Sequence, residues 1–411
     1  ISGSFQGATT ATASFGQMIL NDGKAIRIQH PTENTSVFIG HDAGVDDDGG
    51  NNNIAIGTDS MGEITNGVSN IALGHDSLHT ETTGDYNVAI GDSAMSLASN
   101  ADHTIAIGLL AGKSLRPGSD YNIFMGHDSG ENFAVGDQNI AIGANSMKNT
   151  DSGSDNIAIG SYALDAGENS TTNANIAIGY SAIGSATGYL ANNIALGNGA
   201  MSSAGADGGR VQNSIAIGFN ALKNAEKGQY TSLGPDANIA IGYQAMLDHV
   251  TGSYNIAIGK HAMYQANNEG GAASLSTDQN VVIGYQAARN LQNASANVII
   301  GSSAGLSLGT DEKAIDSNVA IGGGAFQEME EGNGNIVLGP NAMQDATSGS
   351  NNIAMGSRAM NCDVGTDDAG DYNVALGVNS MYGSEGGQYN VAIGYEALYH
   401  VDGVGSNEGE Y

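Results

Sequence analysis

Side chains able to do chemistry occur throughout this 411-residue sequence, but no spacing groups them into a catalytic or metal-binding set. Among the nine histidines, His75, His103 and His127 do not recur at the intervals of a metal-ligand motif. There is no His-Glu-x-x-His or Cys-x-x-Cys motif, and no Gly-x-Ser-x-Gly in a strand–turn–helix context. The single cysteine, Cys362, is assigned no chemistry. We therefore predict that the protein is not an enzyme and assign no catalytic, cofactor-binding or metal-ligating residue.

Acidic clusters and rows of tyrosines are the remaining chemical candidates. Calcium is bound by several oxygen ligands, which acidic loops could supply in part. The Gly-Gly-x-Gly-x-Asp repeat of calcium-binding solenoids is absent, so solvated loops are favoured and bound calcium is the alternative. Tyrosines beside a recurring motif, such as Tyr86 and Tyr180, could stack on sugars or pack at a corner. The acidic clusters are Asp46–Asp48, Asp367 with Asp368 and Asp371, and Glu328 with Glu330 and Glu331.

The composition excludes several classes of partner. The net charge is −31, from 43 acidic and 12 basic residues, which disfavours binding to nucleic acid or to an anionic membrane. One cysteine cannot form an intrachain disulfide. No run of 18 apolar residues occurs, so we expect no transmembrane helix and no membrane insertion. The sequence begins with Ile1, and we expect a fragment or a processed product.

A short repeat carries nearly all of these residues. The motif Asn-Ile-Ala-Ile-Gly at residues 53–57 recurs with slight variation, giving twenty copies in all. Eleven of the nineteen intervals between their closing glycines are 17 residues. The other intervals are longer, so insertions fall between the copies and never within the motif. A fixed period of this size predicts a stack of equivalent structural units.

Within each copy, apolar residues alternate in size. With the closing glycine as position 0, position −3 is Ile or Val and position −1 is Ile, Leu or Met in every copy. This period of two predicts a short β-strand with the large aliphatic side chains on one face. We expect that face to be the buried core of one coil, followed by a tight turn at the glycine. The predicted core residues include Ile54, Ile56, Ile71, Leu73, Val88, Ile90, Ile239, Ile241, Val391 and Ile393.

The opposite face of the strand carries a small residue at position −2, which is Ala in fifteen copies. A solvent-facing residue would vary freely, so we expect a second surface to press against Ala55, Ala72, Ala89, Ala240 and Ala392. Position −4 is Asn in seventeen copies, which predicts a hydrogen-bonded ladder along the stack, with a polar ligand-binding row as the alternative. The ladder would include Asn53, Asn70, Asn87, Asn238 and Asn390.

These patterns predict an all-β chain, a parallel β-solenoid or β-roll of about twenty coils of ~17 residues over residues 34–400. Residues 1–33 are interpreted as a connector with two short strands around Asn21–Gly23, a hairpin signal. Residues 401–411 form a tail or a junction to a removed or missing domain. The largest insertions, near 202–213, 223–237, 264–279, 306–317 and 361–372, are either binding loops or the product of neutral drift.

The copies Asn238–Met246 and Asn390–Leu398 resemble a repeat of phage tail fibres, and the core Val-Ala-Ile-Gly-x-x-Ala/Ser is similar to the head repeat of trimeric autotransporter adhesins. Met or Leu at position +4 departs from the adhesin repeat, which makes the tail-fibre repeat the closer match. The resemblance implies a parallel, in-register homotrimer in which the alanines at position −2 contact sister chains. It also implies a C-terminal intramolecular chaperone that cleaves itself off, and the end at Tyr411 would fit such a cut.

The resulting expectation is a structural and adhesive shaft of a trimeric fibre, located in the virion as a phage tail fibre or other appendage. Its partners would be itself and a glycan or protein receptor on the host surface. The first alternative is a bacterial trimeric adhesin at the cell surface. A polysaccharide-depolymerising tailspike is less favoured because it needs paired carboxylates in a groove, and none can be assigned.

Overall fold

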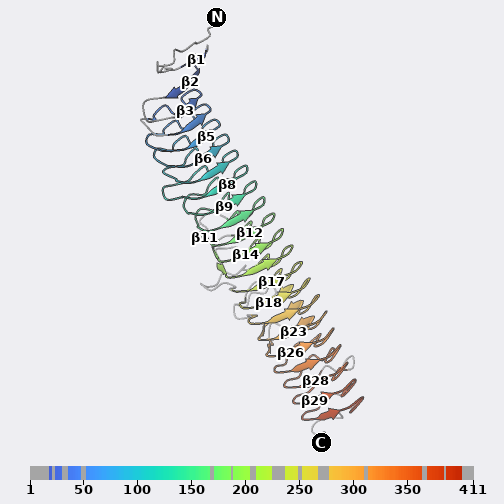
Figure 1. Cartoon of the computed structure of the whole chain (residues 1–411). Helices are drawn as coiled ribbons and strands as arrows, with labels where there is room; N and C mark the ends of the chain where they lie inside the picture. Colours follow the sequence, from blue (N-terminus) through green and yellow to red (C-terminus); the bar gives the residue numbers. More distant parts are fainter. Residues whose placement is uncertain are drawn as a thin grey trace. The chain divides into compact units, whose positions relative to one another are not determined.

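The chain forms a parallel β-solenoid of about 18 turns, and the described residues contain no helix (Figure 1). The computed structural model describes residues 18–20, 24–29, 36–47, 52–166, 171–186, 188–203, 210–224, 237–248, 252–266, 277–309, 313–362, 368–383 and 386–399. The all-β solenoid predicted from the repeat is therefore confirmed, while the predicted tail 401–411 lies outside the described residues. The chain divides into two compact units, Ile1–Thr172 and Asn173–Tyr411.

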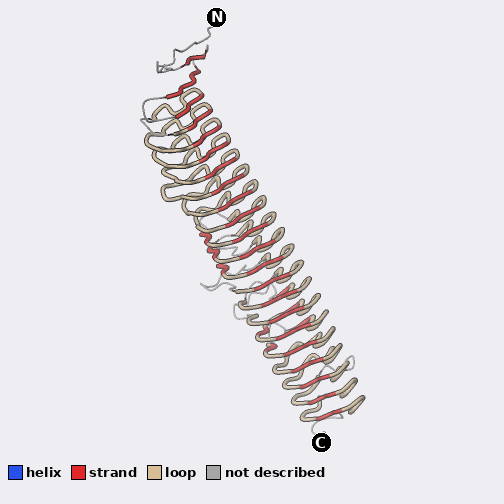
Figure 2. The backbone as a smooth tube through the Cα atoms, in the orientation of Figure 1, coloured by secondary structure: helices blue, strands red, loops and turns tan. Residues whose placement is uncertain are grey.

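In the first unit, each repeat contributes one short strand to a parallel sheet, visible as the red segments of successive coils in Figure 2. The strands pair in register, so that Ile54 lies beside Ile71 and Ala55 beside Ala72. Each position of the repeat therefore forms a column along the stack. The strands are β3 (Ser36–Ile39), β4 (Ile54–Ile56), β5 (Ile71–Leu73), β6 (Val88–Ile90), β7 (Ile105–Ile107), β8 (Ile123–Met125), β9 (Ile140–Ile142) and β10 (Ile157–Ile159).

A hairpin precedes the first coil, as the sequence predicted. Strands β1 (Met18–Leu20) and β2 (Lys24–Gln29) are antiparallel, with Leu20 opposite Lys24. Strand β2 then pairs antiparallel with β3. The backbone groups on that edge of the first coil are thereby occupied, which an open sheet edge would leave unpaired.

The second unit continues the same pattern and adds short strands on other sides of its larger coils. β11 (Thr171–Asn173) lies at the unit boundary. The added strands pair in parallel as β13 (Tyr189–Ala191) with β15 (Arg210–Gln212), as β19 (Gln265–Ala266) with β21 (Asn290–Leu291) and β24 (Ser307–Leu308), and as β22 (Ala294–Ser295) with β25 (Ile315–Asp316). The motif strands are β12 (Ile176–Ile178), β14 (Ile194–Leu196), β16 (Ile215–Ile217), β17 (Ile239–Ile241), β18 (Ile256–Ile258), β20 (Val281–Ile283), β23 (Val298–Ile300), β26 (Val319–Ile321), β27 (Ile336–Leu338), β28 (Ile353–Met355), β29 (Val374–Leu376) and β30 (Val391–Ile393).

The core of each coil is the reverse of the one predicted. Ile54 and Leu73 are 39% and 44% exposed, whereas Ala55 is fully buried. The interior is filled instead by residues after the glycine, such as Met61 at position +4 and Ile64 at position +7, both fully buried. Each of Ile54, Ile56, Ile71, Leu73, Val88, Ile90, Ile239, Ile241, Val391 and Ile393 points out of its coil and is half-buried or exposed.

The narrow coil explains this reversal. Close packing allows only as much side-chain volume on the strand as the opposing turn leaves free. Met at position +4 adopts positive φ, as at Met61 (52°) and Met95 (52°), and its long side chain fills the interior. A methyl group at position −2 then completes the core. The predicted contact of Ala55, Ala72, Ala89, Ala240 and Ala392 with sister chains is therefore wrong, because these side chains lie inside their own coils.

The closing glycine is required by the stacking itself. A Cβ atom on Gly57 would lie 2.2 Å from the carbonyl oxygen of Gly74 in the next coil, at a φ of +145°. L-residues avoid that backbone region, and no side chain fits the space. The predicted tight turn at position 0 is thus also a point of close approach between the backbones of consecutive coils.

Candidate functional site

An apolar outer face runs along the motif strands of each unit. It is formed by the side chains at positions −3 and −1 and is called the aliphatic face below. Ile142 and Ile159 are each 38% exposed in the first unit, and Ile178 is 39% exposed in the second. Because the strands pair in register, these side chains form unbroken columns rather than scattered contacts. Soluble monomers rarely expose contiguous apolar patches of more than a few hundred Å².

Exposed aromatic rings border the aliphatic face. Tyr86, His103 and Tyr121, each at position −5, stack with ring centroids 4.9 and 4.7 Å apart. Tyr372 and Tyr389 occupy the same position in the second unit and stack at 5.1 Å with nearly parallel planes. Their faces contact one another, so these rings extend the apolar surface but leave mainly their edges for a further partner.

The asparagines at position −4 form the ladder expected from the sequence. Asn70 Oδ1 accepts the backbone N–H of Asn87 at 2.8 Å, and Asn70 Nδ2 donates to the carbonyl of Gly84 at 2.7 Å. Asn53 makes the equivalent bonds one coil earlier. In the second unit, Asn238 and Asn390 continue the pattern. Asn53, Asn70, Asn87 and Asn238 are fully buried, so the ladder is internal and is not a ligand-binding row.

A second ladder, of aspartates at position −6, was not predicted. Asp102 Oδ1 accepts the backbone N–H of Asp85 at 2.7 Å, and Asp120 Oδ1 accepts that of Asp102 at 2.9 Å. Asp137 continues the column. The sequence signal was Asp recurring six residues before the closing glycine at intervals of 17 or 18. These partly buried carboxylates account for part of the acidity as structural groups, since each satisfies a backbone donor.

Cations and aromatic rings gather in one region of the second unit. Lys260 Nζ lies 5.5 Å from the ring of Tyr243 and 5.9 Å from that of Tyr285, and the Arg289 guanidinium lies 5.5 Å from Tyr264. In a chain with only 12 basic residues this grouping is distinctive. Such surfaces bind sugars through stacking and anions through charge. The aromatic–cationic patch is defined as Phe219, Tyr243, Lys260, His261, Tyr264, Tyr285 and Arg289.

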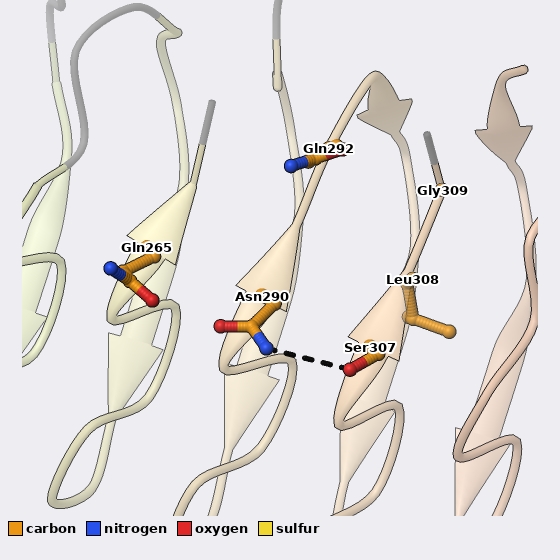
Figure 3. A pocket seen from close by; sticks show the side chains of 6 residues that line it. All are labelled: Gln265, Asn290, Gln292, Ser307, Leu308 and Gly309. Carbon is orange, nitrogen blue, oxygen red and sulfur yellow. Dashed lines mark hydrogen bonds between the residues drawn. The ribbon is translucent and has the colours of Figure 1, made fainter. Parts of the chain in front are cut away.

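A polar pocket adjoins this patch in the chain, because Gln265 follows Tyr264 and Asn290 follows Arg289. Its volume is about 280 Å³, just below the roughly 300–1,000 Å³ of pockets for drug-sized ligands. Figure 3 shows Gln265, Asn290 and Ser307 on three parallel strands, with Asn290 Nδ2 donating to Ser307 Oγ at 3.4 Å. Amide and hydroxyl groups of this kind recognise neutral polar ligands such as sugars. The lining residues are Gln265, Asn290, Gln292, Ser307, Leu308 and Gly309.

Several polar atoms in this region have no hydrogen-bond partner among the described residues. They are Asn290 Oδ1, Arg289 Nε and His261 Nδ1, all of them buried atoms. Burial lowers the pKa of His261, and the positive charges of Lys260 and Arg289 lower it further. The imidazole is therefore neutral at pH 7, with Nε2 3.0 Å from Gln244 Oε1. A ligand hydroxyl or a water molecule would satisfy Asn290 Oδ1.

The pocket belongs to the parts of the chain that vary between repeats. Gln265 lies within the insertion at 264–279, and Ser307 to Gly309 lie within the insertion at 306–317. The sequence indicated these insertions as candidate binding loops but could not show that they line one pocket. The pocket has no carboxylate in its lining, so it does not provide the paired acids of a glycoside hydrolase.

Comparison with known proteins gives no indication of function, so a function is inferred from the residues and structure of the chain itself. No protein-family model matches the sequence, and no curated protein matches it. The part of the chain that the structure describes contains no helix that is long and apolar enough to cross a membrane.

Proposed function

We propose that the protein is a structural and adhesive shaft of a homotrimeric fibre, a phage tail fibre or similar virion appendage that contacts the host cell surface. The aliphatic face is the observation that carries the proposal. It presents two aliphatic side chains per coil to the outside of a sheet, and burying them against protein would gain roughly 25 cal/mol per Å² of apolar area. The expectation of a trimer, and of contact with a host surface, comes from the resemblance to tail-fibre repeats.

The chemistry of the aliphatic face favours a second copy of the same chain. It carries no charge in the motif strands, so it offers no charge complementarity to a different partner. Its columns repeat at one spacing, which the same coils of an identical chain match along their whole length. A rotation axis parallel to the stacking direction brings equivalent coils to the same level, and such cyclic assemblies are common among homo-oligomers.

The proposed interface differs from the one expected from the sequence only in which side chains form it. The isoleucines, valines and leucines at positions −3 and −1 meet at the axis, with the stacked rings at position −5 at the border. The alanines stay within each coil. The same alternation of residues thus accounts for both the interior of a coil and its exterior contact.

Mass in solution is the direct test. Static light scattering after size-exclusion chromatography should give about 125 kDa, three times the 41.5 kDa of one chain. A mass of one chain would refute the oligomer, and a mass of two chains would refute the trimer. Neither result would depend on identifying a receptor.

A pair of aspartates in the aliphatic face tests the proposed contact. Ile140→Asp with Ile142→Asp places uncompensated carboxylates at the axis, and burying each of them costs several kcal/mol. We expect dissociation to monomers at micromolar concentration. Leu97→Lys is the matched control, because Leu97 is 54% exposed but lies on the turn at position +6. Equal masses for both variants would contradict the assignment of the interface.

The receptor contact is proposed at the aromatic–cationic patch and the adjoining polar pocket. Asn290→Ala with Gln265→Ala should reduce binding of the fibre to host cells while leaving the trimer mass unchanged. Asn132→Ala, an exposed amide in the first unit, is the control. Undiminished cell binding by the double variant would refute the pocket as receptor site but not the fibre.

A further inference from the structure

Two histidines that are far apart in sequence lie along one column of aspartates in the first unit. Gly-His-Asp occurs at residues 40–42 and again at 74–76, two coils apart, and the intervening coil has Gly-Thr-Asp at 57–59. In-register pairing of β3, β4 and β5 stacks these turns. Asp42, Asp59 and Asp76 therefore occupy position +2 of three consecutive coils.

The ligand atoms of these residues converge. One atom from each of His41, Asp42 and Asp59 lies within 4.8 Å of the others, and the same holds for Asp59, His75 and Asp76. Asp59 is common to both groups. His41 Nδ1 is 2.9 Å from Asp42 Oδ2, and His75 Nδ1 is 3.2 Å from Asp76 Oδ2. Each group thus offers one imidazole nitrogen and two carboxylates.

The backbone fixes this arrangement before any ligand arrives. Asp42, Asp59 and Asp76 all have positive φ, at 51°, 54° and 52°. The Asp59 N–H donates to the His41 carbonyl at 2.9 Å, and the Asp76 N–H donates to the Thr58 carbonyl at 3.0 Å. The carboxylates project from rigid turns, so little ordering is needed to bind an ion.

The third Gly-His-Asp of the chain shows what these groups lack. At residues 126–128, Asp128 Oδ2 is 2.6 Å from Lys148 Nζ, so a lysine neutralises the aspartate. Among the described residues, no Lys or Arg forms an ion pair with Asp42, Asp59 or Asp76. Like charges stacked directly over one another in successive coils repel and are destabilising, as they are between paired strands. A bound cation would supply the charge that Lys148 supplies at Asp128.

We propose that these residues form a two-ion site for divalent transition metals of the zinc class. His41 and Asp42 hold one ion, His75 and Asp76 hold the other, and Asp59 is the ligand that both ions share. Imidazole nitrogen favours zinc and its neighbours over calcium and magnesium, which prefer oxygen ligands alone. Three protein ligands leave at least one position open, which water or a further ligand fills. The site is independent of the proposed fibre function.

Titration calorimetry of the full chain with zinc chloride tests the site. The unaltered chain should show saturable binding, and Asp59→Asn should weaken it by at least about tenfold because it removes the shared ligand. Asparagine also tolerates positive φ, so the turn is retained. His41→Ala with His75→Ala should weaken zinc binding by a similar factor. The metal-free unfolding temperature of each variant checks that it is folded.

His127→Ala is the matched control, since it removes the histidine of the same tripeptide beside the lysine-paired aspartate, and it should bind zinc as the unaltered chain does. Absence of saturable zinc binding would overturn the site. Equal zinc affinity in Asp59→Asn and the unaltered chain would overturn it as well, leaving an adventitious ion only. Calcium binding as tight as zinc binding would show that the imidazoles are not ligands.

Discussion

Removing one asparagine from the ladder should weaken the contact between its own coil and the coil that follows. In Asn70→Ala, the backbone N–H of Asn87 and the carbonyl of Gly84 lose bonds of 2.8 and 2.7 Å. Asn70 is fully buried, so water does not replace it. A buried backbone group left without a partner costs about 1–3 kcal/mol, which gives about 2–6 kcal/mol for the two groups.

The chain itself suggests an intermediate substitution. Thr104 stands where other copies have Asn, and its Oγ1 accepts the Asn122 N–H and donates to the Ser119 carbonyl, both at 3.4 Å. These bonds are longer than those of Asn70. We therefore expect Asn70→Thr to retain part of the ladder and to cost about half as much as Asn70→Ala.

Stacked repeats do not always unfold in one step, so the assay must be local. Hydrogen exchange followed by mass spectrometry should show faster exchange in segments containing Asn87 in Asn70→Ala, and urea unfolding should report the total loss. Asn132→Ala, which removes an exposed amide, should change stability by no more than about 0.5 kcal/mol. If Asn70→Ala and Asn132→Ala were equally stable, the ladder would not be holding the coils together.

Three further substitutions test separate features of the stack. In Gly74→Ala the new Cβ would lie 2.4 Å from the Gly91 carbonyl oxygen, so we expect urea unfolding to show a loss of stability above about 4 kcal/mol. Gly118 is the control because a Cβ there would meet no atom within 4 Å, so Gly118→Ala should cost only about 1–2 kcal/mol for its positive φ. Glu81→Gln should cost about 3 kcal/mol in thermal unfolding, because the fully buried carboxylate accepts backbone N–H groups from five residues; a loss below about 1 kcal/mol would refute this role. Asp102→Asn keeps an acceptor for the Asp85 N–H but removes one of the stacked charges, so it should stabilise the unit by about 0.5 kcal/mol at low salt and by nothing near 1 M NaCl. A gain independent of salt would show that repulsion is not the cause.

The repeat in the sequence predicted the solenoid, its parallel strands and the asparagine ladder, because register follows directly from period. It did not predict which face of the strand is internal. Large aliphatic residues are usually buried, and that rule placed Ile54 and Ile56 in the core. The rule failed because the alternation of Ile with Ala says nothing of the space inside a coil, which Met61 and its equivalents fill from the opposite turn.

The candidate sites could not be predicted from the sequence for a related reason. His75, His103 and His127 looked unrelated because they were compared by linear spacing. The histidine that shares a column with His75 is His41, 34 residues earlier, which is two repeats. Comparing the histidines and aspartates by their position within the repeat, rather than by the number of residues between them, identifies this column and the aspartates at position −6. The pocket at Asn290 depends on insertions of unequal length, and no periodic argument reaches it.

The two ladders connect a coil to its two opposite neighbours. An asparagine such as Asn70 accepts from the coil that follows it, and an aspartate such as Asp102 accepts from the coil that precedes it. A coil that carries both residues is therefore joined to its two neighbours through side-chain oxygens at the same two repeat positions. A duplication or deletion of one whole repeat among such coils would keep these hydrogen bonds and alter the length by about 4.8 Å. Length can then change in small heritable steps, each of which preserves the hydrogen bonds between neighbouring coils.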